Sequence, residues 1–330
     1  MKKNIKKILA LGLTTVLFLG IFTGCNSADN KEQSETVLRI GAQPYPLYSS
    51  IYVAKEMGYL DEEFNKIGEK YEWTDFNSGP LVNEAVASGS EDIGFMADMP
   101  AILAKSSGQD IQIIGNVAYG EKALALIVGK DSDITDPSQL KGKKIAYVKG
   151  SYAQHLLSLI LEKEGLTFND IESVNLAAGD IGAALDGKQI DGAVIWEQFI
   201  SKLTSEGRAR VLIDGTGIKR GNMVTYSTRK FEEEHPEAIE AYIKACQRGS
   251  DYIKTNPKEA ADAIADKFGV SPELLVKIFN NLTFTQALTD DDIKEIKKVE
   301  QYTFKEGIIP SEVNIDELIN TKLLEDAGIK

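Results

Sequence analysis

Short β-branched runs alternate with longer amphipathic segments along the chain from Val37 to about residue 227. This alternation is typical of α/β proteins, in which helices connect the strands of largely parallel sheets. We therefore predict an α/β fold with strands at residues 37–42, 71–76, 92–95, 111–117, 123–128, 144–148, 173–176, 191–195, 210–213 and 224–227. From residue 230 onward almost every segment has helical spacing, including residues 236–254, 257–268, 271–279 and 290–305.

The alternation forms two α/β units that are joined twice, at residues 123–129 and near residues 222–229. We expect two lobes. Residues 37–126 begin lobe 1, residues 127–226 form lobe 2, and residues 227–330 return to lobe 1 with the C-terminal helices. A chain that crosses twice between lobes places a ligand cleft between them and hinges at the crossings.

Residues 1–24 have the order of a secretory signal peptide, with a basic start, an apolar run at residues 8–22 and small residues directly before Cys25. The apolar run is too short to span a bilayer. A cysteine at this place resembles the lipobox of bacterial lipoproteins, which implies a lipid anchor on Cys25 and a linker over residues 25–36. The alternative is an N-terminal helix in which Cys25 is an ordinary thiol.

The chain is acidic, with 50 acidic and 37 basic side chains and a formal net charge of −13 at pH 7. Residues 1–24 contain four lysines and no acid, so the remaining chain is more acidic still. Such a chain, with no basic run beyond this segment, is a poor nucleic-acid binder. Anionic lipids would also repel it. We therefore expect no nucleic-acid partner, and an anchor rather than the protein surface as the attachment to a membrane.

Residues with catalytic or metal-binding chemistry are scarce. Cys246 lies among apolar residues at helical spacing, which favours a packed core residue over a nucleophile. The two histidines, His155 and His235, are far apart in the sequence, so a histidine-based zinc site is not expected. The chain also lacks a Gly-x-Ser-x-Gly motif, a phosphate-binding loop and a dinucleotide fingerprint. We therefore predict a binding protein with no catalytic residues, no metal and no cofactor.

Four strand-to-helix turns carry polar side chains that could hold a ligand. In an open α/β sheet such turns gather at the carboxyl ends of the strands, where ligands bind. The backbone N–H groups at the start of each following helix favour an anion. The four turns are Ser78-Gly79-Pro80, Asp98-Met99-Pro100, Ser151-Tyr152 and Glu197-Gln198. For each turn the alternative is that the polar residue only caps its own helix, so the hypothesis depends on all four lying at equivalent places.

Further candidate ligand contacts follow two of the predicted strands. Trp196 directly follows residues 192–195 and could form an apolar wall of the site or, alternatively, cover the core. Gln43, Tyr48 and Ser49 follow the first strand and could supply hydrogen bonds, although Tyr48 could equally pack on the next helix.

Two carboxylates, those of Asp98 and Glu197, are expected on the two sides of the predicted cleft. They would repel a simple anion unless the ligand also brings a cation, or unless one carboxylate is protonated or turned away. This pattern favours a ligand with an amine over nitrate or sulfate.

The chain resembles the substrate-binding lipoproteins of the aliphatic sulfonate, taurine and nitrate import systems. The resemblance lies in an ordered set of segments: LRIGAQ, AKEMGYLDEE, FNSGP, SGSEDIGFMADMP, LKGKKIAYVKGSYAQHLL and DGAVIWEQF. It covers nearly the whole chain after residue 24 and extends to the helical segment EEEHPEAIEAYIKA. It implies a type II periplasmic-binding-protein fold, whose two α/β lobes close on a ligand and present it to a permease driven by an ATPase.

The resemblance also implies which residues bind the ligand. In the family these contacts come from the loop after the first strand and from the SGP, ADMP and KGS turns, beside an apolar wall. The corresponding residues are Gln43, Tyr48, Ser49, Ser78, Gly79, Ala97, Asp98, Ser151, Tyr152, Trp196 and Glu197. The sequence departs from the closest family pattern at residues 44–47 and 96–97, which leaves the exact ligand open.

We therefore predict a monomeric solute-binding protein of an ABC importer, lipid-anchored on the extracytoplasmic face of the cell membrane. Its ligand is expected to be a small organic sulfonate or a related oxyanion, passed to the permease and its ATPase. One alternative is an enzyme on the same fold, with desulfinase-like or cofactor-precursor chemistry and His155 as the plausible actor. The others are a binder of nitrate, an aromatic acid or a pyrimidine, and a sensory or scaffold protein.

Overall fold

The computed structural model describes residues 37–76 and 79–329, which contain two β-sheets. The strands of the six-stranded sheet are β1 (Val37–Ala42), β2 (Lys70–Asp75), β3 (Ile93–Ala97), β4 (Ile111–Gly120), β10 (Gly221–Thr228) and β11 (Thr283–Phe284). Those of the five-stranded sheet are β5 (Leu124–Gly129), β6 (Lys144–Tyr147), β7 (Glu172–Asn175), β8 (Gly192–Trp196) and β9 (Ala209–Asp214).

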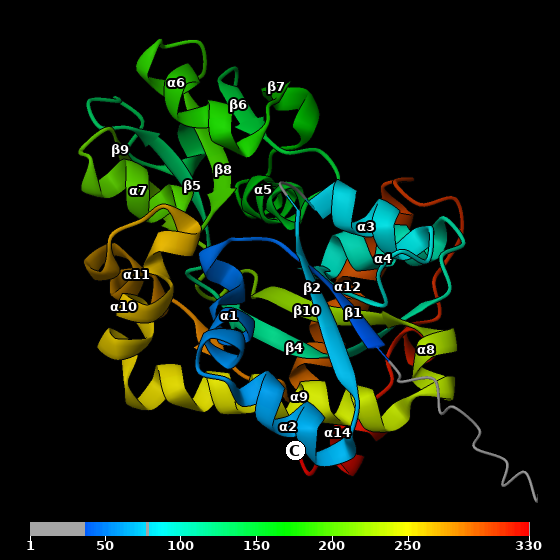
Figure 1. Cartoon of the computed structure of the whole chain (residues 1–330). Coiled ribbons are helices and arrows are strands. Elements are labelled where there is room, and N and C mark those ends of the chain that lie inside the picture. The colour runs from blue at the N-terminus through cyan, green and yellow to red at the C-terminus, as the bar shows by residue number, and fades with distance from the viewer. Residues whose placement is uncertain (1–36, 77–78, 330) are drawn as a thin grey trace, which may run out of the picture. The chain divides into compact units, whose positions relative to one another are not determined.

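Helices surround both sheets (Figure 1). The α-helices are α1 (Ser49–Glu56), α2 (Tyr59–Ile67), α3 (Gly79–Ala87), α4 (Asp98–Ser106), α5 (Tyr152–Lys163), α6 (Ile181–Asp186), α7 (Phe199–Ser205), α8 (Arg229–Glu234), α9 (Pro236–Thr255), α10 (Pro257–Phe268), α11 (Pro272–Phe279), α12 (Asp290–Lys305), α13 (Ile315–Leu318) and α14 (Lys322–Asp326). Short 3₁₀ helices are η1 (Pro46–Tyr48), η2 (Pro137–Leu140), η3 (Phe168–Asp170) and η4 (Ala178–Asp180).

The six-stranded sheet has the order β11-β4-β10-β3-β1-β2. β1 runs parallel to β2 and to β3, whereas β10 runs antiparallel to both of its neighbours, β3 and β4. Every residue of β3 is buried, because this central strand has helices α3 and α4 packed against it. The polar turns that follow β1 and β3 therefore lie at the carboxyl ends of interior strands of the sheet.

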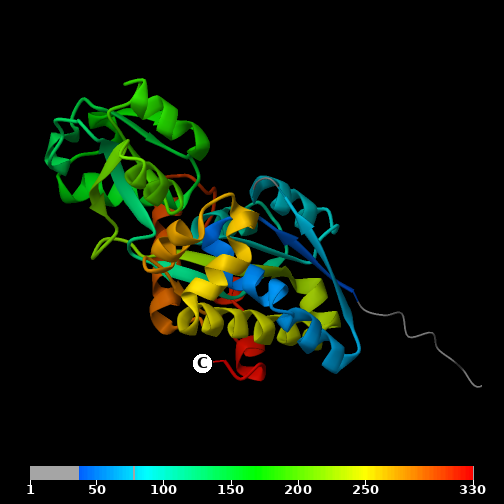
Figure 2. The ribbon, with the colours of Figure 1, turned by 60° about the vertical axis from the view of Figure 1, so that its left-hand side comes forward.

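The five-stranded sheet has the order β7-β6-β8-β5-β9. β6 runs parallel to β7 and β8, whereas β5 runs antiparallel to β8 and β9. Figure 2 shows this sheet and its helices, in green, as a body beside the helices that cover the six-stranded sheet. The α/β fold class predicted from the sequence is confirmed.

One detail of the predicted fold is wrong, because the sheets are mixed rather than largely parallel. In the six-stranded sheet, β4, from which the chain leaves, pairs antiparallel with β10, by which it returns. In the five-stranded sheet, β5, by which the chain enters, pairs antiparallel with β9, from which it leaves. The tail after residue 230 is almost entirely helical, as predicted, and the two-residue strand β11 is its exception. It pairs antiparallel with β4 at the edge of the six-stranded sheet.

The chain passes between the sheets at residues 121–123 and returns at residues 215–220. The two passages lie against each other at Gly215, whose N–H lies 3.1 Å from the carbonyl oxygens of Glu121 and Leu124. A Cβ atom at Gly215 would lie 2.4 Å from the Lys219 carbonyl oxygen and 2.5 Å from that of Glu121. Only glycine fits this close approach.

Helix α9 supports the six-stranded sheet from one side, where it packs against α1 and α2 (Figure 2). Its buried face includes Tyr242 and Cys246, so the packed position predicted for Cys246 is confirmed. Gly249 allows the close approach of α1, because a Cβ atom there would lie 2.1 Å from the Ser50 carbonyl oxygen. Helix α1, which follows the first predicted binding loop, is thus fixed against the core by backbone contact.

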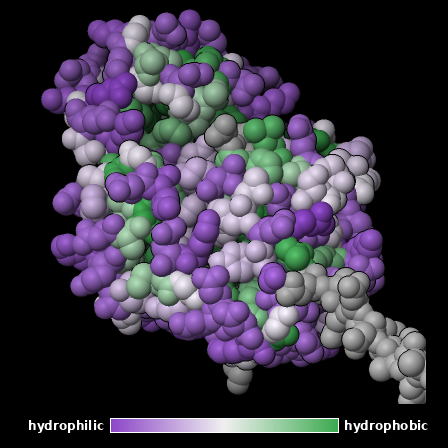
Figure 3. Space-filling model, viewed as in Figure 1, coloured by the Kyte–Doolittle hydropathy of each residue, from purple (hydrophilic) through white to green (hydrophobic). Residues whose placement is uncertain are grey.

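Hydrophilic residues cover most of the face shown in Figure 3, with smaller groups of hydrophobic residues between them. Within residues 37–76 and 79–329, no helix has both the length and the apolar character needed to cross a bilayer. The predicted signal peptide, Cys25 and the linker over residues 25–36 lie outside the described residues.

Candidate functional site

Asp98 begins α4 directly after the central strand β3 and is fully buried, and Ala97 before it is also buried. Its Oδ1 accepts a hydrogen bond from the Met99 N–H at 2.8 Å, and its Oδ2 lies 3.2 Å from Lys219 Nζ. Burial raises the pKa of Asp98, and the Lys219 ammonium opposes that rise. A helix start and a lysine therefore hold this carboxylate inside the protein.

Ser151 and Tyr152 stand at the start of α5 in the other sheet's unit, and both are buried. The Ser151 hydroxyl donates to the Val148 carbonyl at 2.7 Å, so it bonds back into its own turn. The Tyr152 ring lies 5.7 Å from the Trp196 ring between centroids. Among the described residues the Tyr152 hydroxyl has no hydrogen-bond partner, so it is available to a ligand or a water molecule.

Trp196 ends β8, and Glu197 follows it as a fully buried carboxylate. Glu197 Oε1 accepts a hydrogen bond from Asn281 Nδ2 at 2.6 Å, and its Oε2 accepts from the Ser201 N–H at 3.3 Å. Burial raises the pKa of Glu197, whereas these hydrogen bonds oppose the rise. Asn281 lies between α11 and β11, so this contact joins the five-stranded sheet's unit to the C-terminal part of the chain.

The loop after β1 is tied to its neighbours by Gln43. Gln43 Nε2 donates to the Phe95 carbonyl in β3 at 2.9 Å. Its Oε1 would lie 3.3 Å from a Cβ atom at Gly79, the first residue of α3. Gln43 therefore ties the end of β1 to β3, and its side-chain oxygen lies near the start of α3.

Tyr48 and Ser49 follow in the same loop, and both are buried. The Tyr48 ring lies 5.6 Å from the Phe95 ring between centroids, and burial raises the pKa of its hydroxyl. The Ser49 hydroxyl donates to the Pro46 carbonyl at 2.7 Å. The Ser49 and Ser151 hydroxyls are thus both used by their own loops, which sequence spacing does not indicate.

Three predicted site residues, from both sheets, lie close enough to Tyr152 to influence the pKa of its hydroxyl. After burial, which is the main cause, electrostatic interactions with Tyr48, Asp98 and Glu197 raise the pKa of Tyr152 well above its ordinary value. These groups lie on η1, at the start of α4 and after β8. Together with Tyr152 at the start of α5, the structure therefore brings polar groups from four of the predicted turns and loops into one buried region. Ser78 lies outside the described residues.

Two residues of this region were missed from the sequence, namely Lys219 and Asn281. Lys219 contacts Asp98 from 121 positions away, and Asn281 contacts Glu197 from 84 positions away. Neither residue lies in a strand-to-helix turn, so the spacing that identified the other candidates could not find them. The full burial of the Lys219 side chain has no signature in the local sequence.

His155, the residue on which the enzyme alternative depends, is a packing residue in the structure. Its ring stacks on the Tyr302 ring of α12 with the centroids 4.3 Å apart. Burial, with smaller effects of Lys219 and Lys298, lowers the pKa of His155 to about 2. A histidine with such a pKa is neutral at pH 7 and a weak proton acceptor.

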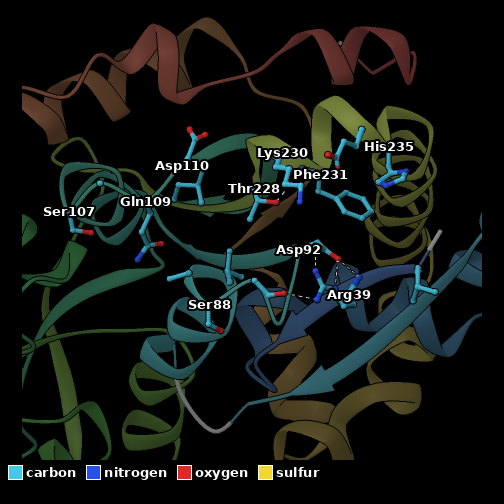
Figure 4. A pocket seen from close by; sticks show the side chains of 17 residues that line it. Arg39, Ser88, Asp92, Ser107, Gln109, Asp110, Thr228, Lys230, Phe231 and His235 are labelled. Atoms are coloured by element: carbon cyan, nitrogen blue, oxygen red, sulfur yellow. Dashed lines mark hydrogen bonds and ion pairs between the residues drawn. The ribbon is translucent and has the colours of Figure 1, made fainter. Parts of the chain in front are cut away.

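A pocket of about 830 Å³ lies at the other end of the six-stranded sheet, where β1 begins and β10 ends (Figure 4). It contains none of the predicted site residues. Its Arg39 guanidinium donates to the Asp92 carboxylate and to the Gly89 carbonyl, so these charges are already paired. Within residues 37–76 and 79–329, no group of three or more His, Cys, Asp or Glu side chains could hold a metal ion.

Comparison with known protein families gives one match of more than half the chain. The family model described as NMT1/THI5 like matches residues 46–260. A Bacillus subtilis protein named as an aliphatic sulfonates-binding protein is 28% identical over 318 residues, which cover 96% of this chain and 95% of that protein. The taurine-binding periplasmic protein of Escherichia coli is 27% identical over 276 residues, covering 78% and 85% of the two chains.

Solved structures agree with the sequence comparisons. The periplasmic aliphatic sulphonate binding protein SsuA from Escherichia coli has a TM-score of 0.79 and 25% identity, covering 86% of this chain and 92% of that chain. The desulfurization enzyme DSZB, with a TM-score of 0.68 and 14% identity, shares the fold alone. The similar proteins named here as binding proteins therefore share more sequence with this chain than that enzyme does.

Proposed function

Since the chain belongs to the NMT1/THI5-like family, we propose that it is an extracytoplasmic solute-binding protein of an ABC importer that binds a small organic sulfonate. The relatives named as aliphatic sulfonate-binding proteins support this function, because their similarity extends over nearly the whole of both chains. Its task is to bind and deliver a ligand without changing any bond in it.

The observation that carries the proposal is the buried group formed by Tyr48, Asp98, Tyr152 and Glu197. Its members come from both sheets, so a ligand between them would contact both units of the protein. Contacts that both units make only in the closed arrangement are what a binding protein needs, because the ligand then stabilises that arrangement.

The starts of α4 and α5 supply the chemistry for an anion. Each is a helix of at least two turns whose positive dipole end favours a negatively charged oxygen. At α5 the unpaired N–H groups of the first turn add to this effect, whereas at α4 the Met99 N–H already donates to Asp98 and Pro100 has no N–H. Trp196 and Tyr152 form an apolar wall beside these starts, suited to an aliphatic or aromatic carbon chain. The eleven residues predicted from the sequence are the proposed contacts, with Ser78 among them.

Delivery requires the two units to move as lobes. The bounds predicted from the sequence, residues 37–126 and 227–330 for lobe 1 and 127–226 for lobe 2, fall inside β5 and β10. We therefore place the boundaries of the lobes, and the hinges, at the two passages between the sheets, residues 121–123 and 215–220. Lipid on Cys25 would hold a monomer at the membrane surface, near the permease and its ATPase, where the net charge of −13 could not.

Thermal unfolding of the full chain in detergent tests the proposal against methanesulfonate, ethanesulfonate, taurine, nitrate, phthalate and a pyrimidine. A bound ligand at a hundred times its dissociation constant adds about 2.7 kcal/mol of stability, or roughly 5 °C in a chain of this size. We expect a shift with sulfonates, no reaction product, and a smaller shift in Tyr152→Ala. Ser88→Ala, at an exposed position far from Tyr152, is the matched control and should respond like the unmodified protein.

No shift of the unfolding temperature with any sulfonate would contradict the proposed ligand class. Formation of a product from a sulfonate would instead favour the enzyme alternative, and its loss in a folded His155→Ala variant would support that alternative further. An equal loss of the shift in Tyr152→Ala and Ser88→Ala would place the ligand elsewhere in the protein.

A further inference from the structure

A buried ion pair connects the returning passage between the sheets to the start of α4. Lys219 Nζ lies 3.2 Å from Asp98 Oδ2, and their side chains are 1% and 0% exposed. Lysine and aspartate are rarely buried so completely unless they are paired, because each charge loses its hydration. The partner of Asp98 therefore comes from the passage between β9 and β10 and not from α4.

Lys219 is held at this place by the backbone around it. Its N–H donates to the Gly215 carbonyl at 2.9 Å, in the tight contact between the two passages described above. Two residues later, a Cβ atom at Gly221 would lie 3.3 Å from the Tyr152 ring. The segment that carries Lys219 thus runs between the start of α4 and the start of α5, inside the proposed site.

The ion pair changes the net charge at the start of α4, where a ligand would bind. An unpaired Asp98 carboxylate at the start of α4 would attract a ligand ammonium and repel a sulfonate. With Lys219 beside it, the carboxylate is neutralised, and a ligand ammonium placed there would be buried without a partner. The expectation that two carboxylates favour a ligand with an amine did not include this lysine.

We propose that Lys219, by pairing with Asp98, makes the site select organic sulfonates that carry no ammonium group. This specificity rests on the proposed function as a sulfonate-binding protein. Lys219 determines specificity through Asp98 and helps to keep α4 in place at the returning passage. The site would therefore bind alkanesulfonates, and it would disfavour amino-alkanesulfonates.

Glu197 is the other carboxylate that could decide the same choice. It already accepts hydrogen bonds from the Asn281 side chain and the Ser201 N–H, so it has less capacity for a ligand ammonium than a free carboxylate. Glu197→Gln therefore tests the competing explanation: it alters a proposed ligand contact and removes a buried carboxylate of the same region without touching the ion pair, and only its effect on the ratio of dissociation constants is interpreted. Ser88→Ala, outside the proposed site, is the neutral control.

Calorimetric titration of the full chain in detergent with ethanesulfonate and with taurine tests the proposal, since the two ligands differ by one ammonium group. The measured quantity is the ratio of the two dissociation constants, which cancels any loss of folded protein. We expect the unmodified protein to prefer ethanesulfonate by at least about tenfold, which corresponds to the energy of one poorly paired charge. The variants are Lys219→Gln, Asp98→Asn, the double variant and Glu197→Gln.

Opposite changes in the two single variants would support the proposal. Lys219→Gln should lower the preference for ethanesulfonate about tenfold or more, and Asp98→Asn should raise it. The double variant should return it to the original ratio, because neither charge remains. If Lys219→Gln fails to fold, as thermal unfolding will show, Asp98→Asn and the double variant still give the comparison.

Two results would overturn the inference and leave the proposed function standing. One is sulfonate binding with the same ratio in all variants, or with a preference for taurine in the unmodified protein. The other is a change of ratio in Glu197→Gln alone. Absence of sulfonate binding by the unmodified protein is a different result, and it would overturn the proposed function together with the inference.

Discussion

Acid should weaken this protein through His155, and replacing His155 with glutamine should remove that part of the weakening. The unfolded chain takes up a proton at His155 below the ordinary pKa of 6.5, whereas the folded protein takes it up only near a pKa of about 2. Lowering the pH through the window from 6.5 to about 2 therefore favours the unfolded state. The stability that neutral His155 provides is fully present above pH 6.5 and is lost progressively below it.

The magnitude follows from the two pKa values. Between pH 7.5 and pH 5.0 the difference contributes about 2 kcal/mol to the free energy of unfolding. Burial is the main reason, because the ring is only 4% exposed and lies against Tyr302. Lys219 and Lys298 add repulsion against an imidazolium.

Urea unfolding followed by tryptophan fluorescence at pH 7.5 and 5.0 measures this contribution in the unmodified protein and in His155→Gln. Only the difference between their two pH responses is interpreted. Other groups titrate equally in both proteins, including Glu232, whose pKa is raised by burial to about 8 and which acts in the opposite sense. The unmodified protein should lose about 2 kcal/mol more than the variant on acidification. A difference below about 0.5 kcal/mol would refute the buried, neutral state of His155.

Two further substitutions test the packing around the site by urea unfolding. Asn281→Ala should lower the free energy of unfolding by about 1–3 kcal/mol, because the buried Glu197 carboxylate loses a 2.6 Å hydrogen bond; no change would mean that water replaces the amide. Gly249→Ala should cost about 1–3 kcal/mol or more, since its Cβ atom would meet the Ser50 carbonyl oxygen at 2.1 Å. Gly179→Ala, where nothing lies within 4 Å, should stay within about 0.5 kcal/mol, and equal effects of the two alanines would contradict the close approach.

The family and the fold class could be predicted because their signals are local. Strand periodicity and the ordered segments from residue 37 onward lie in single stretches of chain, and both predictions are confirmed. The mixed direction of the sheets was missed because it depends on pairing between strands that are distant in sequence, such as β10 with β3 and β4. No sequence pattern within residues 221–228 predicts which strands β10 pairs with.

The candidate site was only partly accessible from the sequence for the same reason. Strand-to-helix turns identified Asp98, Tyr152 and Glu197, since each lies directly after a strand or at a helix start. The partners that set the charge of this region, Lys219 and Asn281, come from distant segments and have no motif. Carboxylates can thus be located by turn chemistry, whereas their neutralisation is a property of tertiary packing. The ligand contacts themselves stay predictions.

The position of β10 also sets the order in which the chain can fold as it is made. All strands of the five-stranded sheet lie within residues 124–214, so that sheet can be completed as one continuous stretch. β3 and β4 have no hydrogen-bonded contact with each other and meet only through β10, which arrives about a hundred residues after them. The edges of β3 and β4 that pair with β10 therefore stay unpaired until residue 228 has emerged from the ribosome. The six-stranded sheet of a nascent chain therefore stays incomplete until late in synthesis, which leaves the chain unfolded enough to pass through a membrane channel.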